Sequence, residues 1–190
     1  ATGELVEYNN HVKILELLDA SFSDDRVCAT MVVSRTQSGK TGSMCSVIRQ
    51  SVKSGLGSPI PVPVPNVFII TGVSSREWCA QTRARVPPSI RNNVYHANDL
   101  DGKFVEALKG KKNVIIIMDE IQVAARRGQL IHRVFEKAEL MDRAQLCVRD
   151  IKIIEYTATP DGTVYDLARW GDAAHCIVAE PGKGYTSSKD

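Results

Sequence analysis

The sequence predicts an α/β fold: one domain built on a mainly parallel β-sheet with helices on both faces. Short apolar runs typical of buried strands recur along the chain, at residues 27–33, 67–70, 114–118 and 151–156. Such runs are apolar throughout because the strands of a parallel sheet are covered on both faces. Stretches with helical spacing lie between these runs. This alternation favours parallel pairing, and it places ligand-binding residues at the carboxyl ends of the strands.

The first half of the chain begins this alternation. Apolar residues at 12–18 predict an N-terminal helix, which the strand at 27–33 follows. A second helix is expected at 41–52. Alternate prolines at 59–65 remove every second backbone donor, so this segment is expected to be an extended connector into the next strand.

The second half continues the alternation with shorter elements. A helix is expected over 75–85, where it stops before two prolines. The remaining helices are expected at 103–108, 129–141 and 164–170. The remaining strands are expected at 94–96, 114–118, 151–156 and 176–178.

The composition excludes several classes of protein. A length of 190 residues suits one domain, with 43% hydrophobic and 24% charged residues. The net charge of +2 gives no bulk support for nucleic-acid binding, so any such surface must be local. No apolar run approaches the ~20 residues that cross a bilayer. No signal peptide is visible either, so we expect no membrane partner.

The cysteines are odd in number and scattered, at Cys28, Cys45, Cys79, Cys147 and Cys176. None has Cys-x-x-Cys spacing, which argues against a zinc site and against a disulfide framework. We therefore expect an intracellular, reducing compartment, the cytoplasm or nucleus, with the thiols acting as small apolar side chains. The four histidines show no metal-ligand spacing, and we expect them to be structural.

The segment Ser-Arg-Thr-Gln-Ser-Gly-Lys-Thr, which follows the first strand, indicates a phosphate-binding loop. Gly39 lets the backbone approach a phosphate, Lys40 can reach the β- and γ-phosphates, and the Thr41 hydroxyl can hold Mg²⁺. Backbone N–H groups of the loop and of the next helix supply the anion cradle. The alternative is an ordinary helix start with Ser34 or Thr36 as its N-cap.

An acidic pair, Asp119 and Glu120, follows the strand at 114–118. A carboxylate at the end of this strand can hold Mg²⁺, usually through water. Glu120 can polarise the water that attacks the γ-phosphate, which would support hydrolysis rather than binding alone. The alternative is an acidic turn or helix N-terminus, where carboxylates are favoured in any case.

Two hydroxyl residues, Thr157 and Thr159, end the strand at 151–156. They could hydrogen-bond to the acidic pair beside the expected γ-phosphate and relay the state of the nucleotide. The alternative is a strand end closed by threonine and by Pro160.

These segments, taken in order, resemble the motifs of superfamily 2 helicases and translocases. Residues 37–41 resemble motif I, residues 119–122 resemble motif II, the Asp-Glu-x-x box, and residues 157–159 resemble motif III. The strand at 67–71 and residues 75–81 are similar to motif Ia. The resemblance covers nearly the whole chain and implies a single RecA-like P-loop domain.

The resemblance also implies ATP and Mg²⁺ as cofactors and gives the site residues their roles. Nucleotide-binding residues would be Gln37, Ser38, Gly39, Lys40, Thr41 and Gly42. Catalytic residues would be Lys40, Asp119, Glu120 and Gln122. Mg²⁺ would be placed by Thr41 and Asp119. Movement would be coupled to the nucleotide through Gln122, Thr157 and Thr159.

Near the N-terminus, Leu5-Val6-Glu7-Tyr8-Asn9 looks like the Leu-x-x-Tyr-Gln segment of the same family, which meets adenine. Tyr8 could stack on the base, and Asn9 could donate to and accept from its edge. Asn9 departs from the family's Gln, and a helix cap at Asn9 or Asn10 is the alternative.

The motif Ia segment implies nucleic-acid contacts through Ser75, Arg76 and Gln81. Further arginines follow it, at positions 83, 85 and 91. Such groups suit sequence-independent, salt-sensitive phosphate contacts. The alternative for each arginine is a solvated helix face. Nucleic acid is the expected partner, with DNA favoured over RNA, and the terse motifs suggest a viral or mobile-element source.

We expect residues 1–180 to form the ATP-binding domain, helicase domain 1. Residues 181–190 would be a linker toward a second RecA-like domain that carries an arginine finger. Without this finger such ATPases lose roughly 10³–10⁵ in rate, so the isolated domain should be weakly active. Two alternatives remain: a thymidine-type nucleotide kinase, and an ATP-gated interaction module without turnover. The chain has no paired cysteines for the zinc-holding lasso of the kinase.

Overall fold

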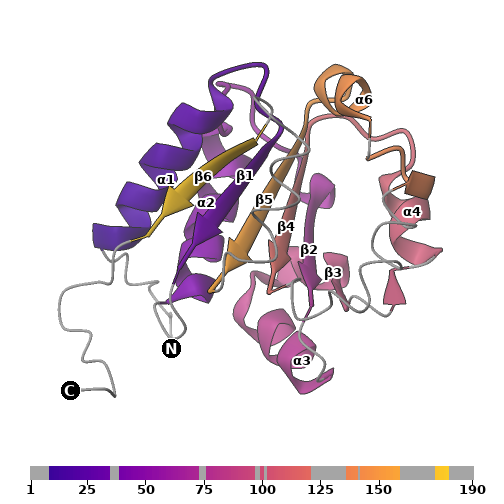
Figure 1. Cartoon of the computed structure of the whole chain (residues 1–190). Helices are drawn as coiled ribbons and strands as arrows, with labels where there is room; N and C mark the ends of the chain where they lie inside the picture. The colour runs from indigo at the N-terminus through magenta and orange to yellow at the C-terminus, as the bar shows by residue number, and fades with distance from the viewer. Residues whose placement is uncertain are drawn as a thin grey trace, which may run out of the picture.

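The chain folds around a six-stranded parallel sheet (Figure 1). The computed structural model describes residues 9–34, 39–72, 76–96, 99–100, 102–120, 136–140, 142–158 and 174–179. Its strands are β1 (Ala29–Val33), β2 (Val67–Thr71), β3 (Val94–His96), β4 (Val114–Asp119), β5 (Ile151–Thr157) and β6 (Ala174–Val178). They lie in the order β3-β2-β4-β5-β1-β6, and every neighbouring pair is parallel.

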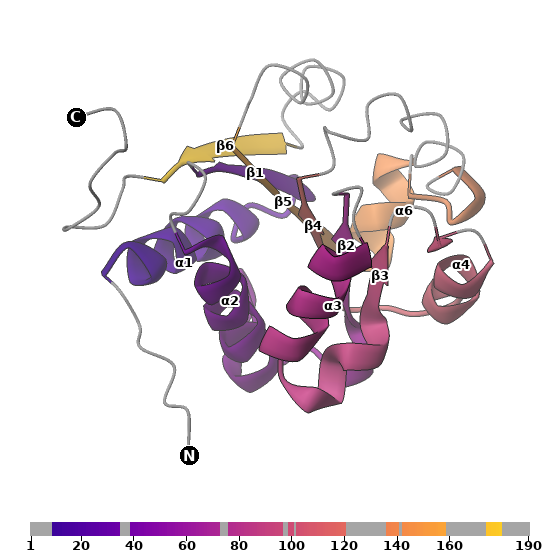
Figure 2. The same cartoon turned by 90° about the horizontal axis from the view of Figure 1, so that it is seen from below.

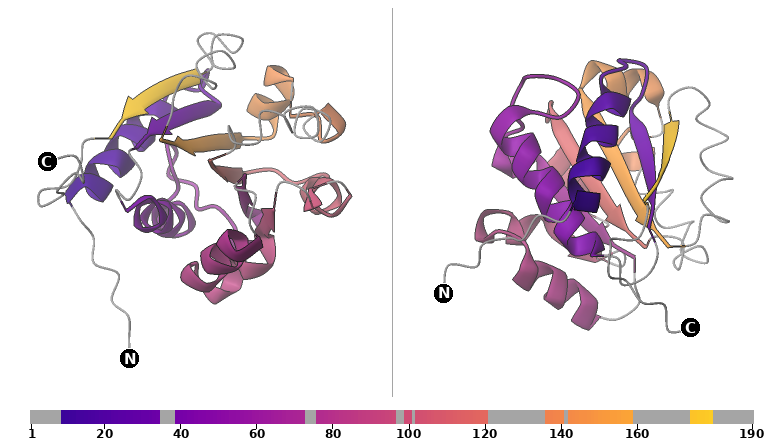
Figure 3. Two further views of the ribbon diagram at one scale, coloured as in Figure 1. Left: turned by 60° about the horizontal axis from the view of Figure 1, so that its bottom comes forward. Right: turned by 90° about the vertical axis from the view of Figure 1, so that its left-hand side faces the viewer.

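Helices cover both faces of this sheet (Figure 2). The described helices are α1 (Asn9–Phe22), α2 (Lys40–Ser54), α3 (Arg76–Arg85), α4 (Lys103–Leu108) and α6 (Arg143–Val148). Two 3₁₀ turns, η1 (Val64–Asn66) and η2 (Pro88–Asn93), lead into β2 and β3. α1, α2 and α3 lie on one face and α4 and α6 on the other, with α1 and α2 side by side (Figure 3). The predicted α/β class, with its parallel sheet and two helical layers, is confirmed, and it is consistent with a RecA-like domain.

Alternate side chains of each central strand enter opposite cores because successive residues of a strand point to opposite faces. In β4, Ile115 and Ile117 belong to the core beneath α1, α2 and α3, whereas Ile116 and Met118 belong to the core beneath α4 and α6. This two-sided burial explains why β4 is apolar at every position from Val114 to Met118.

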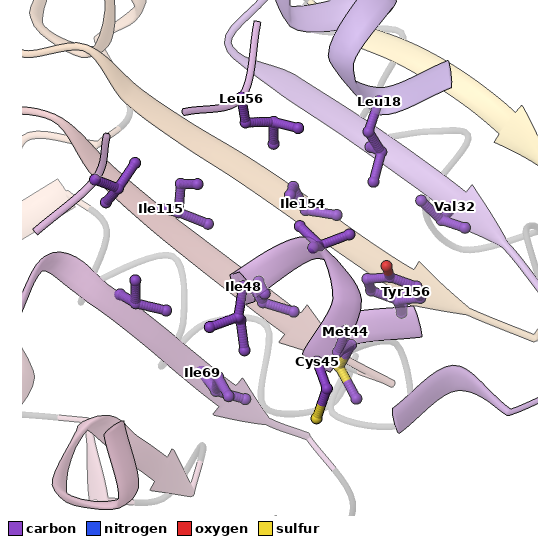
Figure 4. Close-up of a cluster of buried hydrophobic side chains, with 14 of the residues drawn as sticks. Leu18, Val32, Met44, Cys45, Ile48, Leu56, Ile69, Ile115, Ile154 and Tyr156 are labelled. Carbon is purple, nitrogen blue, oxygen red and sulfur yellow. The ribbon is translucent and has the colours of Figure 1, made fainter. Parts of the chain in front are cut away.

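The helix α2 packs directly over the centre of the sheet (Figure 4). Met44 and Ile48 of this helix face Ile154 and Tyr156 of β5, and these four side chains are at most 2% exposed. The position of α2 is therefore fixed by close packing along its length. The N-terminal end of α2, at Gly39 and Lys40, is held by the same packing.

The carboxyl ends of four strands lie level with one another. Thr71 of β2 pairs with Asp119 of β4, which pairs with Tyr156 of β5. The next residue of β5, Thr157, pairs with Val33 of β1. The strand that carries the acidic pair and the strand that leads into the loop are thus separated only by β5. Residues that follow these strand ends are held at one edge of the sheet.

Some predicted elements need correction or lie outside the described residues. None of the predicted helices corresponds to α6. This helix is short, and the side chain of its N-cap, Asp142, accepts a hydrogen bond from Ala144 N–H at 2.9 Å. Of the helix expected at 129–141, only 136–140 is described, and 138–140 form a turn. The helix expected at 164–170 lies outside the described residues. Of the connector expected at 59–65, residues 59–60 form a bend, Pro63 has the predicted polyproline-like backbone (φ −58°, ψ 138°), and Val64 begins η1.

The cysteine prediction is correct for three of the five residues. Cys28, Cys45 and Cys79 are buried, and burial raises the pKa of the Cys28 thiol to about 11. Cys147 and Cys176 are exposed, so their prediction as apolar core residues is wrong. Among the described helices, none is both long and apolar enough to cross a bilayer.

Because β5 lies inside the sheet and β6 at its edge, truncating a side chain on each strand should change the free energy of unfolding by different amounts. Ile154 is fully buried, so Ile154→Ala should lower the free energy of unfolding by about 2–5 kcal/mol because a cavity remains. Val178 on the edge strand β6 is 69% exposed, and Val178→Ala is the matched control with a change within about 0.5 kcal/mol. Urea unfolding followed by circular dichroism measures both. Equal losses would contradict this sheet order.

Candidate nucleotide-binding site

The predicted phosphate loop runs from β1 to the start of α2. After β1, Ser34 N donates to Thr157 O of β5 at 2.7 Å, which extends the sheet by one residue. α2 begins at Lys40, and Gly39 is its N-cap with a left-handed backbone (φ 77°). Glycine adopts this conformation without steric cost. Because the N-cap is Gly39, which has no side chain, the alternative of an ordinary start with Ser34 or Thr36 as the N-cap is wrong.

The lysine of this loop meets both members of the acidic pair. Lys40 Nζ lies 3.7 Å from Asp119 Oδ1 and makes a short ion pair with Glu120 Oε1. The side chain of Asp119 is only 1% exposed, while Lys40 and Glu120 are 11% and 13% exposed. The structure thus brings Lys40, at the start of α2, together with two neighbouring acids at the end of β4 that lie about 80 positions further along the sequence.

The backbone at Glu120 explains how two adjacent carboxylates reach one ammonium. In an extended strand, consecutive side chains would point to opposite faces. Glu120 instead has φ 53°, a left-handed conformation that is uncommon for a residue with a Cβ. Its N–H donates to Tyr156 O at 3.0 Å, which holds the turn against β5. Because of this turn, the Glu120 side chain points in a direction that an extended backbone would not allow.

β5 supplies the support beneath these groups. Tyr156 is fully buried, and its hydroxyl lies 2.9 Å from Ser43 Oγ of α2. Burial raises the pKa of Tyr156 well above its usual range, and the Asp119 carboxylate raises it further against the opposing Ser43 hydrogen bond. Thr157 is also fully buried. The first turns of α2 and the end of β5 are therefore joined directly under the acidic pair.

The site has the donors that a magnesium ion would need. One ammonium and two carboxylates leave a formal charge of −1 on Lys40, Asp119 and Glu120. The Asp119 carboxylate and the Thr41 hydroxyl, in the first turn of α2, are oxygen ligands that hard cations prefer. No group of three or more His, Cys, Asp or Glu side chains forms a metal site in the described part of the chain. The residues present fit an ion that is completed by phosphate and water oxygens.

Several predicted site residues lie outside what the structure describes. These are Tyr8, Gln37, Ser38, Ser75, Gln122 and Thr159, together with the side chains of Asn9 and Arg76. Their roles stay predictions. Asn9 is the first residue of α1.

The basic residues near the motif Ia segment divide into two kinds. Arg83 donates from Nε (3.2 Å) and Nη2 (2.8 Å) to Val94 O, so its guanidinium ties α3 to β3. This tie gives Arg83 a structural use. Arg85 and Arg91 are exposed on α3 and η2, as is the neutral Gln81.

Sequence reasoning missed three residues that the structure places at the site. Ser43 and Tyr156 join α2 to β5, and the buried imidazole of His11 packs against Gly39 and Gly42. The contact between the Ser43 and Tyr156 hydroxyls could not be predicted from the spacing of these residues in the sequence. His11 could have been found as a polar residue at helical spacing from the apolar Ile14 and Leu18.

No protein-family model matches this chain, and the comparison with curated proteins finds no match either. The family resemblance therefore stays a prediction from the sequence motifs.

The left-handed turn at Glu120 predicts an unusual order of stability between two truncations. Glu120→Gly and Glu120→Ala both remove the carboxylate, but alanine has a Cβ that clashes in this conformation. The glycine variant should therefore be more stable than the alanine variant, by about 1 kcal/mol in the free energy of unfolding. Urea titration of the two proteins measures the difference. An alanine variant as stable as the glycine variant would show that the turn is not left-handed.

Proposed function

We propose that this chain is the ATP-binding and ATP-hydrolysing domain of a superfamily 2 type helicase or translocase. In this proposal, hydrolysis is coupled to nucleic-acid binding in the full-length protein. The observation that carries the proposal is the meeting of Lys40 with Asp119 and Glu120 at the carboxyl edge of the sheet. Partly buried charges that meet at the carboxyl edge of a parallel sheet mark a candidate functional site.

The anion cradle is supported by the helix start. The first N–H groups of α2 have no partner within the helix, and they carry the positive end of its dipole. Gly39 places them at the end of the loop without a side-chain cap. A nucleotide phosphate is the ligand that such a helix N-terminus and a lysine bind together.

The charges favour an exchange when ATP binds. In this structure the Lys40 ammonium pairs with the two carboxylates. A phosphate would bind this ammonium more strongly. If Lys40 turns to the phosphate, Asp119 and Glu120 are left with a formal charge of −2. Mg²⁺ supplies a matching positive charge when bound and polarises the phosphoryl oxygens. Asp119 and Thr41 would hold it.

Glu120 is the candidate for water activation. It is more exposed than Asp119, so it can meet solvent while Asp119 stays fixed at the strand end. A general base must lie within hydrogen-bond reach of the water it polarises. Release of Glu120 from Lys40 on ATP binding would free its carboxylate for this role. The base therefore becomes available only when the loop is occupied.

The nucleic-acid part of the proposal is supported by exposed polar residues on one side of the domain. Gln81 and Arg85 on α3, with Arg91 on η2, are open to solvent. Phosphate contacts use such groups without reading sequence. DNA is favoured over RNA, as predicted from the motifs.

Removal of the lysine charge should abolish nucleotide binding. Lys40→Met keeps the aliphatic stem but loses the ammonium, so affinity for MgATP should fall by at least about 100-fold, as for loss of a charge-assisted phosphate contact in a partly buried site. Isothermal titration calorimetry measures this loss. Lys53→Met, at the exposed far end of α2, is the control with unchanged affinity.

Circular dichroism decides whether the Lys40 variant is folded, and Lys40→Arg retains the charge if it is not. Unchanged MgATP affinity in folded Lys40→Met would refute the loop assignment. Arginine should restore part of the binding because its guanidinium also pairs with phosphate.

Removal of the second carboxylate should separate binding from hydrolysis. Glu120→Gln should bind MgATP at least as tightly as the wild type because it removes a competing partner of Lys40. Its rate of phosphate release should fall by about 10²–10⁴-fold, the usual contribution of a general base. Nucleotide retention and phosphate release are measured in parallel, with Glu106→Gln on α4 as the surface control.

Phosphate release by Glu120→Gln at the wild-type rate would show that this carboxylate is not the base. The same assay with single-stranded DNA, single-stranded RNA and duplex added reports which nucleic acid stimulates the full-length protein. Equal rates with all of them and with none would contradict the coupling to nucleic acid.

A further inference from the structure

His11 occupies the space next to the phosphate loop that side chains at two glycine positions would need. A Cβ built on Gly42 would lie 2.6 Å from His11 Cε1 and 3.4 Å from both ring nitrogens. A Cβ on Gly39 would lie 3.0 Å from His11 Nε2. The imidazole is only 3% exposed, so it has little room to move aside.

The ring is held in place by the helix that carries it. His11, Ile14 and Leu18 follow one another at helical spacing along the buried side of α1. Ile14 and Leu18 pack into the core beneath α2, at 4% and 0% exposed. His11 continues this stripe up to the loop, where it is the polar member.

The contact also accounts for a glycine in an unfavourable place. Gly42 lies in the first turn of α2, where alanine would favour the helix more than glycine does. Its left-handed neighbour Gly39 needs to be glycine for its φ of 77°, but no such φ applies to Gly42. The space taken by His11 is the reason in this structure that position 42 has no side chain.

We propose that His11 is a positioning residue for nucleotide binding. Its imidazole sets the distance between α1 and the first turn of α2, and so the place of the backbone N–H groups that cradle the phosphates. This inference rests on the proposed function. It adds a residue of α1 to the determinants of the phosphate cradle, which the motifs place in the loop and at the start of the next helix.

If the proposal is correct, a larger side chain at position 42 is tolerated only when the side chain at position 11 is smaller. Gly42→Ala should push the ring and the helix start apart, and MgATP affinity should fall by about tenfold or more, as expected of an overpacked contact. His11→Ala should also weaken affinity, because the cradle loses one wall. The double variant His11→Ala/Gly42→Ala refills the space with a methyl group, and its affinity should return to within roughly threefold of His11→Ala.

The test is a double-mutant cycle with two readouts, MgATP affinity by calorimetry and thermal unfolding of the nucleotide-free proteins. Glu16→Ala, on the exposed side of α1, is the control. Rescue of affinity in the double variant supports the proposal. Folded Gly42→Ala or His11→Ala with wild-type affinity overturns it, as does a double variant that is more than about threefold weaker than both single variants.

The failure of this inference is distinguishable from failure of the proposed function. Absence of MgATP binding in the wild-type protein refutes the function. In that case additive shifts in unfolding temperature around the cycle refute the steric contact separately, because contacting residues give non-additive effects.

Discussion

One lysine ammonium faces two carboxylates that are neighbours in the sequence, and the arrangement of the site depends on this contact. Asp119 is the last residue of a buried strand, so its direction is fixed by the sheet. Glu120 can share its partner only because its backbone turns to a left-handed conformation. Such conformations cost free energy and are held by the surrounding structure, here by the hydrogen bond to Tyr156 O. The strained backbone conformation and one of the carboxylates that pair with Lys40 thus belong to the same residue, Glu120.

The sheet order makes this contact possible. β5 lies between the strand that ends in Asp119 and the strand that leads to the loop, and it supplies both the acceptor for Glu120 N–H and the Tyr156 hydroxyl that reaches Ser43. The start of α2 is therefore tied to the acidic turn through one strand. A change in the partner of Lys40 would act on this packed frame, as the proposed response to a bound phosphate requires.

Much of the fold could be predicted from the sequence, because fully apolar strands and punctuating loops are local signals. The strand at 114–118 and the helix at 103–108 were recognised from such patterns. The acidic pair and the lysine were recognised as residue types, but the φ of Glu120 depends on a hydrogen bond to β5, which spacing along the chain does not encode. His11 was missed because its role depends on the missing Cβ at position 42, and the exposed Cys147 because the short helix α6 was not predicted.

The central claim is that Lys40 exchanges its acidic partners for a nucleotide phosphate at this edge of the sheet. A crystal structure with Mg²⁺ and a non-hydrolysable ATP analogue tests it most directly. The account predicts Lys40 Nζ at about 2.7–2.9 Å from a phosphate oxygen, with Glu120 released toward solvent. An analogue bound elsewhere, or bound here while the Lys40–Glu120 ion pair stays intact, would contradict it.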